Sequence, residues 1–120
     1  MKIEKNILQM FAIYCNFDNA SMMIVKFLAS EGEYKTIMDI GENIRYDRTT
    51  IQKRVKRMCF VYKFVERKKL SNTVTGGFKF SYKLNVEKCL EYLLKRMEDE
   101  RETVKENIME VEEKLEDGKE

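Results

Sequence analysis

One helical face that carries only cations and hydrogen-bond donors is the feature of this sequence best suited to chemistry. Asp47 is a good N-terminal cap, and Ile51, Val55 and Met58 follow it in a helical spacing, which predicts an amphipathic helix over residues 47–61. The eight other positions between Asp47 and Met58 can all donate hydrogen bonds; five are cationic and none is acidic. Because a solvated helix face normally mixes both signs of charge, this one favours a polyanion, and DNA is the best candidate.

Positive charge is concentrated in the middle third of the chain. Residues 45–85 carry 12 basic and 2 acidic side chains, residues 1–44 carry 4 and 6, and residues 86–120 carry 7 and 13. The formal net charge of +2 therefore conceals a strongly basic middle segment. Such a segment is the electrostatic footprint of a nucleic-acid-binding protein, whereas the acidic final segment is not.

Groups that usually serve metal binding or catalysis are scarce. The sequence has no histidine, and its three cysteines, Cys15, Cys59 and Cys89, lie far apart and form no Cys-x-x-Cys pair. Structural zinc normally needs four cysteine or histidine ligands, so we expect no metal ion and no cofactor. We interpret the thiols as small buried apolar groups and leave a redox-sensing role open. Without a phosphate-binding glycine loop or a catalytic carboxylate pair, we expect no enzymatic activity.

Three shorter helices are expected before the cationic one. The first spans residues 2–15, the second is capped by Asn19 or Ser21 and runs to about Ala29, and the third spans about residues 35–43. The short link Arg45-Tyr46 then leads into the cationic helix. Two helices joined in this way, the second of them basic, are typical of a helix-turn-helix unit whose second helix enters the DNA major groove.

Residues 64–84 favour a two-stranded hairpin. Apolar and polar residues alternate strictly in its second half, so strands are predicted at residues 64–70 and 78–84. The polar segment between the strands ends in two glycines, which can adopt positive φ in a turn. Because the hairpin carries several lysines and arginines, we expect this wing to contact the DNA backbone or minor groove, although it could simply close the core.

A long final helix is predicted from Val86 to about Asp117, with Asn85 as its cap. Apolar residues recur along it at alternating spacings of four and three, with one charged interruption at Arg101. This heptad series predicts a coiled-coil dimer that pairs through Leu90, Leu94, Met97, Val104, Ile108, Val111 and Leu115. At 1.5 Å per residue the helix would be roughly 48 Å long, well beyond one small domain. Folding back onto its own domain is the alternative, and it suits residues 86–97 better than the more charged remainder.

The predicted architecture is mainly α with a small β-hairpin: a winged helix-turn-helix with a long C-terminal dimerisation helix. Residues 1–85 would form the DNA-binding domain, with the recognition helix at 47–61 and the wing at 64–84, and residues 86–120 would form the coiled coil. No apolar run approaches the roughly 20 residues needed to cross a bilayer, and the N-terminus lacks the pattern of a signal peptide. We therefore expect a cytoplasmic protein with no membrane partner.

Four stretches match a known pattern: Arg48-Thr-Thr-Ile51 and Val55-Lys-Arg-Met58 in the cationic helix, Phe64-Val-Glu-Arg67 at the wing, and Gly76-Gly-Phe-Lys-Phe-Ser-Tyr-Lys83 after it. Together with the long charged helix, they make residues 20–117 resemble the winged helix-turn-helix transcriptional regulators of archaea, particularly small TrmB-like proteins. One departure from the pattern of those proteins is Tyr62-Lys63, where a glycine is common. It puts in question the geometry of the turn between the cationic helix and the wing. Nothing resembles the sugar-binding domain of larger members, so no sugar effector is implied.

The leading hypothesis is a homodimeric, sequence-specific transcription factor that binds double-stranded DNA, with half-sites about one turn, or about 34 Å, apart. The N-terminal half of a recognition helix usually meets base edges, and here its candidates are Arg48, Thr49, Gln52 and Lys53. The candidates for phosphate contacts on the same helix are Arg54, Lys56 and Arg57. Further candidates lie beside this helix or in the wing: Arg45, Thr50, Lys68, Lys69, Asn72, Thr73, Thr75 and Lys79.

Two other functions fit the same sequence. A winged helix joined to a coiled coil could coat DNA as a chromatin protein with little sequence preference, although a net charge of +2 and an acidic tail favour a regulator. Alternatively, the basic face could bind an acidic protein partner and never touch DNA. The sequence leaves open the operator, the direction of regulation, any small-molecule effector, and whether the final helices pair parallel or antiparallel.

Overall fold

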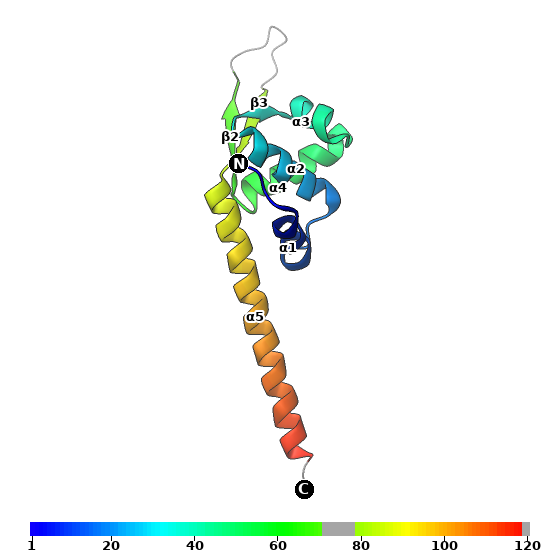
Figure 1. Ribbon diagram of the computed structural model, residues 1–120, viewed down its shortest axis with the longest axis vertical. Coiled ribbons are helices and arrows are strands. Elements are labelled where there is room, and N and C mark those ends of the chain that lie inside the picture. Colours follow the sequence, from blue (N-terminus) through cyan, green and yellow to red (C-terminus); the bar gives the residue numbers. More distant parts are fainter. Residues whose placement is uncertain (71–78, 119–120) are drawn as a thin grey trace.

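Short helices and a small sheet lie at one end of a long final helix (Figure 1). The computed structural model describes residues 1–70 and 79–118. Within these residues the elements, in chain order, are α1 (Lys5–Cys15), α2 (Asn19–Glu31), β1 (Lys35–Thr36), α3 (Ile37–Ile44), α4 (Arg48–Phe60), β2 (Val65–Lys69), β3 (Phe80–Leu84) and α5 (Val86–Asp117).

Two predicted caps fix where α4 and α5 begin. The Asp47 carboxylate accepts a hydrogen bond from the Thr50 amide at 3.1 Å, and the Asn85 side chain accepts from the Lys88 amide at 3.1 Å. Each cap satisfies one of the amides that the first turn of a helix leaves without an internal partner. Both caps are therefore confirmed, and the cationic helix and the long helix begin where the sequence places them.

The second helix has a different cap from the predicted one. The prediction of Asn19 or Ser21 is wrong, because the Asp18 carboxylate accepts from the Ser21 amide at 2.9 Å. Aspartate, asparagine and serine are almost equally good caps, so residue type alone could not choose among neighbours. The first helix is also shorter than the predicted 2–15, since α1 begins at Lys5.

The sheet has three strands in the order β1–β3–β2, whereas a two-stranded wing was predicted. Both strand pairs are antiparallel. The third strand, β1, is two residues long, which is too short to show the alternation of apolar and polar residues that predicts a strand. The helix predicted for residues 35–43 therefore starts late: Lys35 and Thr36 pair with β3, and Thr36 then caps α3 in a reciprocal capping box with Asp39.

The wing strands β2 and β3 are shorter than the predicted 64–70 and 78–84, and position 78 lies outside the described residues. Ser81, which the alternation placed on the exposed side, is only 3% exposed. β3 is the central strand, and this small side chain lies between its larger cross-strand partners Thr36 and Lys68. A central position therefore buries a residue that an isolated hairpin would expose.

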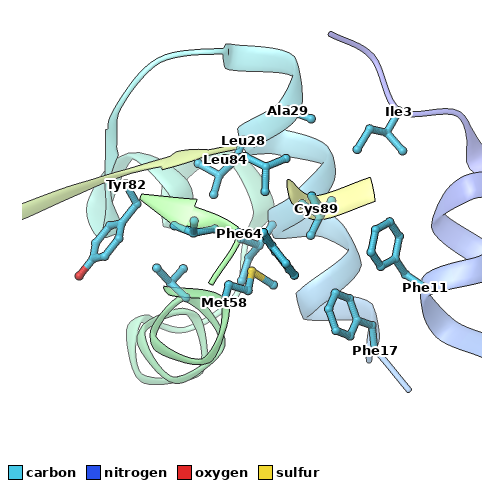
Figure 2. Packing of buried hydrophobic residues seen from close by; sticks show 14 of the residues in the cluster. Ile3, Phe11, Phe17, Leu28, Ala29, Met58, Phe64, Tyr82, Leu84 and Cys89 are labelled. Carbon is cyan, nitrogen blue, oxygen red and sulfur yellow. The ribbon is translucent and has the colours of Figure 1, made fainter. Parts of the chain in front are cut away.

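Apolar side chains from the helices and from one face of the sheet form the core (Figure 2). The three residues predicted to line the inner side of α4, Ile51, Val55 and Met58, are at most 1% exposed. Burying an aliphatic side chain of this size stabilises a fold by about 1.5–3 kcal/mol. Their burial fixes the rotation of α4 about its axis, and with it the set of residues that face solvent.

An aromatic cluster packs two interhelix or helix-to-strand links against α5. The rings of Phe17, Tyr62, Phe64 and Tyr92 come from the α1–α2 link, the α4–β2 link and α5, and their centroids lie 4.9–6.5 Å apart. These separations fall in the range in which tilted and offset ring pairs attract one another. The cluster thus fixes the end of α4 and the start of the wing against the long helix.

The turn between α4 and β2 contains a residue in a left-handed conformation, Lys63. Lys63 adopts φ of 62°, the left-handed conformation that a glycine would adopt at no steric cost. The following Phe64 amide donates to the Met58 carbonyl at 3.0 Å, and the Phe64 carbonyl accepts from the Asn85 amide at 2.8 Å. Backbone hydrogen bonds therefore hold the turn, with strain at one lysine.

The first turns of α5 pack on the domain, and the remainder projects away from it (Figure 1). Cys89 and Leu93 are buried in the core, whereas residues 98–117 are all exposed. The alternative of folding back therefore applies to residues 86–97, and it uses Cys89 and Leu93, which are not in the heptad series. The predicted boundary between the DNA-binding domain and the coiled coil, at residue 86, falls at the start of α5. It remains an interpretation, because residues of this helix also belong to the core.

Most of the heptad series forms an exposed seam along α5, whereas Leu90 is half-buried and Met97 is half-buried against the core. Five of its apolar side chains are 46–61% exposed: Leu94, Val104, Ile108, Val111 and Leu115. The molecule is 79 Å long for a width of 28 Å, mainly because of this projecting helix. In the described part of the chain, no helix is long and apolar enough to cross a membrane.

Replacing Lys63 with glycine should stabilise the protein. A left-handed conformation costs a residue with a Cβ about 1–2 kcal/mol, and the extra freedom of glycine in the unfolded chain takes back about 0.5–1 kcal/mol. We therefore expect urea denaturation to show a gain of up to about 1 kcal/mol. The matched control, Lys95→Gly within α5, should lose about 1 kcal/mol because its helical backbone needs no glycine. Equal losses in the two variants would contradict the assignment of strain to Lys63.

Candidate nucleic-acid interface

The solvent face of α4 presents four residues at spacings of four and three: Thr49, Lys53, Lys56 and Phe60. We call these residues the α4 stripe. They lie on the side of the helix opposite the buried apolar residues, and all four are exposed, the Phe60 ring by 52%. Two ammonium groups, a hydroxyl and an aromatic ring on one surface are suited to phosphates and base edges.

On one side of the α4 stripe, Arg48 and Gln52 face the wing. Together with Lys79, Phe80 and Tyr82 they line the same hollow between the helix and β3. Arg48 is exposed and Gln52 half-buried. The fold thus brings two residues predicted to read bases next to a wing lysine about 30 positions later in the chain.

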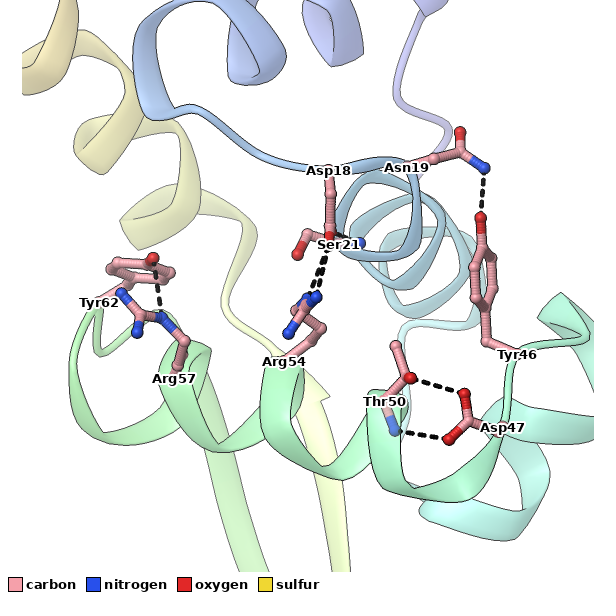
Figure 3. Close-up of polar contacts among 9 residues, drawn as sticks. All are labelled: Asp18, Asn19, Ser21, Tyr46, Asp47, Thr50, Arg54, Arg57 and Tyr62. Carbon is pink, nitrogen blue, oxygen red and sulfur yellow. Dashed lines mark hydrogen bonds and ion pairs between the residues drawn. The ribbon is translucent and has the colours of Figure 1, made fainter.

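On the other side of the stripe, Arg54 is held by Asp18 (Figure 3). Its Nε and a terminal nitrogen donate to the same Asp18 oxygen, Oδ2, at 2.8 and 2.7 Å. This hydrogen bond from Arg54 is the main reason that the pKa of Asp18 falls to about 2. One carboxylate therefore caps α2 and fixes α4 against it.

Two further candidates also make contacts within the protein. The Arg57 Nε donates to the Tyr62 hydroxyl at 3.2 Å, and its guanidinium lies 5.6 Å from the centre of that ring. The Thr50 hydroxyl donates to the Asp47 carboxylate, which strengthens the cap of α4 (Figure 3). In the described part of the chain, Arg54 is the one cation of α4 with an acidic partner. The positive charge of the helix is thus largely available to a ligand.

Arg67 is a cation of the predicted wing that was not among the predicted DNA-binding residues. Its guanidinium lies 4.9 Å from the centre of the Phe60 ring and 4.0 Å from that of Phe80, so it joins the end of α4 to the wing. A guanidinium stacked on rings keeps its N–H donors pointing outward, ready for a phosphate. No periodicity links Phe60, Arg67 and Phe80, since the turn and the strand register bring them together.

The wing cations divide between the two faces of the sheet. Lys68 lies 5.7 Å from the Tyr34 ring and Lys83 lies 5.8 Å from it, on the face opposite the core. Lys69 and Lys79 lie at the end of the strand pair nearest the connecting residues 71–78. Arg45 is exposed at the end of α3, with φ of 57°. Three predicted DNA-binding residues, Asn72, Thr73 and Thr75, lie outside the described residues.

The thiols have the surroundings of core residues. Cys15 and Cys89 are buried and Cys59 is half-buried, and all three are free. Burial raises the pKa of Cys15 to about 11 and that of Cys89 to about 12, which keeps both thiols protonated near neutral pH. Across residues 1–70 and 79–118 there is no cluster of three histidine, cysteine or acidic residues that could hold a metal ion.

Comparison with known proteins identifies a fold. No family model matches the chain, and no curated protein is significantly similar to it in sequence. A solved structure from Methanosarcina mazei Go1, described as a possible transcriptional regulator, is similar over 87% of each chain, with a TM-score of 0.76 and 16% identity. The similarity confirms the predicted winged-helix architecture: a mainly helical domain with a small antiparallel sheet and a long C-terminal helix.

Replacing Asp18 with asparagine should remove the ion pair with Arg54 and keep the helix cap, because asparagine caps as well as aspartate. Both side chains are partly exposed, so we expect a loss of only about 0.5–1 kcal/mol at pH 7. The folded pKa of Asp18 lies below its unfolded value of about 3.9, so the pair stabilises the protein above that pH and is lost as pH falls towards about 2.

Urea denaturation at pH 7, 4 and 2 measures this difference. The wild-type advantage over Asp18→Asn should disappear between pH 4 and 2, while Asp18→Ala, which also loses the cap, should be less stable by a further ~1 kcal/mol at each pH. An advantage that is as large at pH 2 as at pH 7 would show that the pair with Arg54 is not its source.

Proposed function

We propose that the chain is a transcription regulator that binds double-stranded DNA as a homodimer in the cytoplasm. The observation that carries this proposal is the α4 stripe, whose cations are exposed, lie beside the wing of a winged-helix fold and have no acidic partner among residues 1–70 and 79–118. The neighbour of the same fold is itself described as a possible transcriptional regulator. The narrower assignment to small archaeal TrmB-like regulators rests on the sequence motifs.

In the proposed complex α4 lies in the major groove. Its N-terminal half carries the candidates for base readout, Arg48, Thr49, Gln52 and Lys53; an arginine suits guanine and a glutamine suits adenine. Lys56 lies one turn further along the α4 stripe and would bind phosphate. Arg67, held by two rings at the angle between helix and wing, would bind phosphate through two N–H groups.

The arginines on the far flank would contribute more to positioning than to affinity. Arg54 would have to exchange the Asp18 carboxylate, at 2.7 Å, for a phosphate before it could bind DNA. Arg57 is similarly engaged with Tyr62. We therefore assign to Arg54 the task of fixing the orientation of α4, and to the α4 stripe the contacts with DNA.

Dimerisation through α5 is supported by the exposed seam from Leu94 to Leu115. A helix that projects from its domain with a heptad row of half-exposed apolar residues can bury that row only against another helix. The chain itself supplies an identical partner. Two paired tails would present two copies of the α4 stripe, as a roughly palindromic site requires.

Replacing Lys53 and Lys56 with alanine should weaken DNA binding and reduce its salt dependence. Each Lys56 that neutralises a phosphate contributes about one unit to the slope of log Kd against log salt, so a dimer should lose about 2 units, while the loss of Lys53 weakens binding through its base contact. Fluorescence anisotropy from 50 to 200 mM salt measures the slope. Lys26→Ala on α2 is the matched control and should behave as wild type; equal losses in both variants would contradict the assignment.

Selection of bound DNA from a random pool tests whether the protein reads sequence. A regulator should enrich a roughly palindromic motif, and Gln52→Ala should lose preference at one position of each half-site, worth about 1–3 kcal/mol for a bidentate contact. Tight binding without an enriched motif would instead favour the chromatin protein considered as the alternative.

Replacing Ile108 with lysine should convert the dimer to a monomer, because a charge in the middle of the seam would have to be buried. Thr103→Lys adds the same charge outside the heptad seam and should leave the dimer intact. Light scattering over a dilution series measures the mass. A monomeric wild-type protein, or an Ile108→Lys dimer of unchanged stability, would rule out pairing through this seam.

A further inference from the structure

A hollow of about 540 Å³ lies between α3, the start of α4 and β3. Small-molecule sites in proteins are typically about 300–1,000 Å³, so the hollow has room for a ligand of one or two rings. Its wall is mostly apolar and is provided by Ile37, Met38, Tyr46, Phe80 and Tyr82. A hydrated phosphate backbone gains nothing from such a surface, so DNA binding does not explain it.

The Tyr46 and Phe80 side chains provide rings as the apolar surface of the hollow. The Tyr46 hydroxyl accepts a hydrogen bond from the Asn19 side chain, which is not among the lining residues (Figure 3). Phe80 is held on one face by the Arg67 guanidinium, 4.0 Å from its ring centre. Tyr82 is only 7% exposed. These contacts fix the rings, so the apolar wall is preformed.

The charges at the hollow favour a monoanion. Arg48 and Lys79 line it with one acidic residue, Glu42, which leaves one excess positive charge. Neither cation has an acidic partner in the described part of the chain. A flat apolar group with a single carboxylate would match both the wall and the excess charge.

We propose that this hollow binds a small aromatic monocarboxylate, with its ring against the Tyr46, Phe80 and Tyr82 side chains and its carboxylate towards Arg48 and Lys79. Three residues of the hollow, Arg48, Gln52 and Lys79, are also candidates for contacting DNA. A bound carboxylate therefore excludes DNA from the same surface, and this last step rests on the proposed function. The ligand would release the regulator from its operator by direct competition.

Calorimetry with 1-naphthoate, and with the uncharged 1-naphthalenemethanol, tests the site without DNA. The wild-type protein should bind the carboxylate about tenfold more tightly than the alcohol, and Arg48→Gln should remove most of that difference. Gly41 also lines the hollow, and a Cβ there meets its nearest neighbour, Ile51 Cδ1, at an ordinary 3.5 Å. Gly41→Leu, with its folding checked by circular dichroism, should fill part of the space and lose about tenfold or more in affinity for both compounds.

The matched control is Gln9→Leu, which adds the same side chain at an exposed position of α1 and should bind as wild type. Absence of saturable binding, equal affinities for acid and alcohol, or unchanged binding by Gly41→Leu would overturn the proposed site. Displacement of DNA is measured separately, by adding 1-naphthoate to the preformed complex. Intact DNA binding without naphthoate binding removes this inference alone, whereas naphthoate binding by a protein that ignores DNA removes the proposed function alone.

Discussion

The burial of Ile51, Val55 and Met58 is the constraint on which the rest of the surface depends. These three side chains lock α4 into the core at a single rotation, and a turn of even one residue would expose an apolar side chain at a cost of a few kcal/mol. Once the rotation is fixed, Thr49, Lys53 and Lys56 can only face solvent. A charge pattern that would cost stability inside a core is thus kept on the surface by hydrophobic packing on the other side of the same helix.

The flanks of α4 differ in what they do, although the sequence gives both of them cations. Arg54 is engaged with Asp18 and Arg57 with Tyr62, so that flank ties α4 to α2 and to the aromatic cluster. The other flank meets the wing, where Arg48 and Gln52 line a hollow whose wall is apolar. The cations of one flank therefore make contacts within the protein, whereas Arg48 on the other flank lines the hollow beside the wing.

The long helix also has two separate apolar surfaces. Cys89 and Leu93 anchor its first turns in the core, while the heptad seam stays exposed and continues beyond the domain. Because both surfaces belong to one rigid helix, the position of the domain is fixed relative to any helix that pairs with the seam. Pairing of the tails would then set the spacing of two recognition helices.

Sequence alone determined the features that depend on short-range pattern: the amphipathic α4 with its Asp47 cap, the long α5 with its Asn85 cap, the heptad seam and the charge distribution. Each depends on the spacing of residues within one element. The 3.6-residue period of a helix and the preferences of capping residues are therefore enough to predict it. The tertiary structure decided the rest. The two-residue β1, the buried Ser81, the pair of Asp18 with Arg54 and the stack of Phe60, Arg67 and Phe80 join residues distant in the chain. Their contacts depend on how elements dock, and that is fixed by packing across the whole core, not by any local pattern.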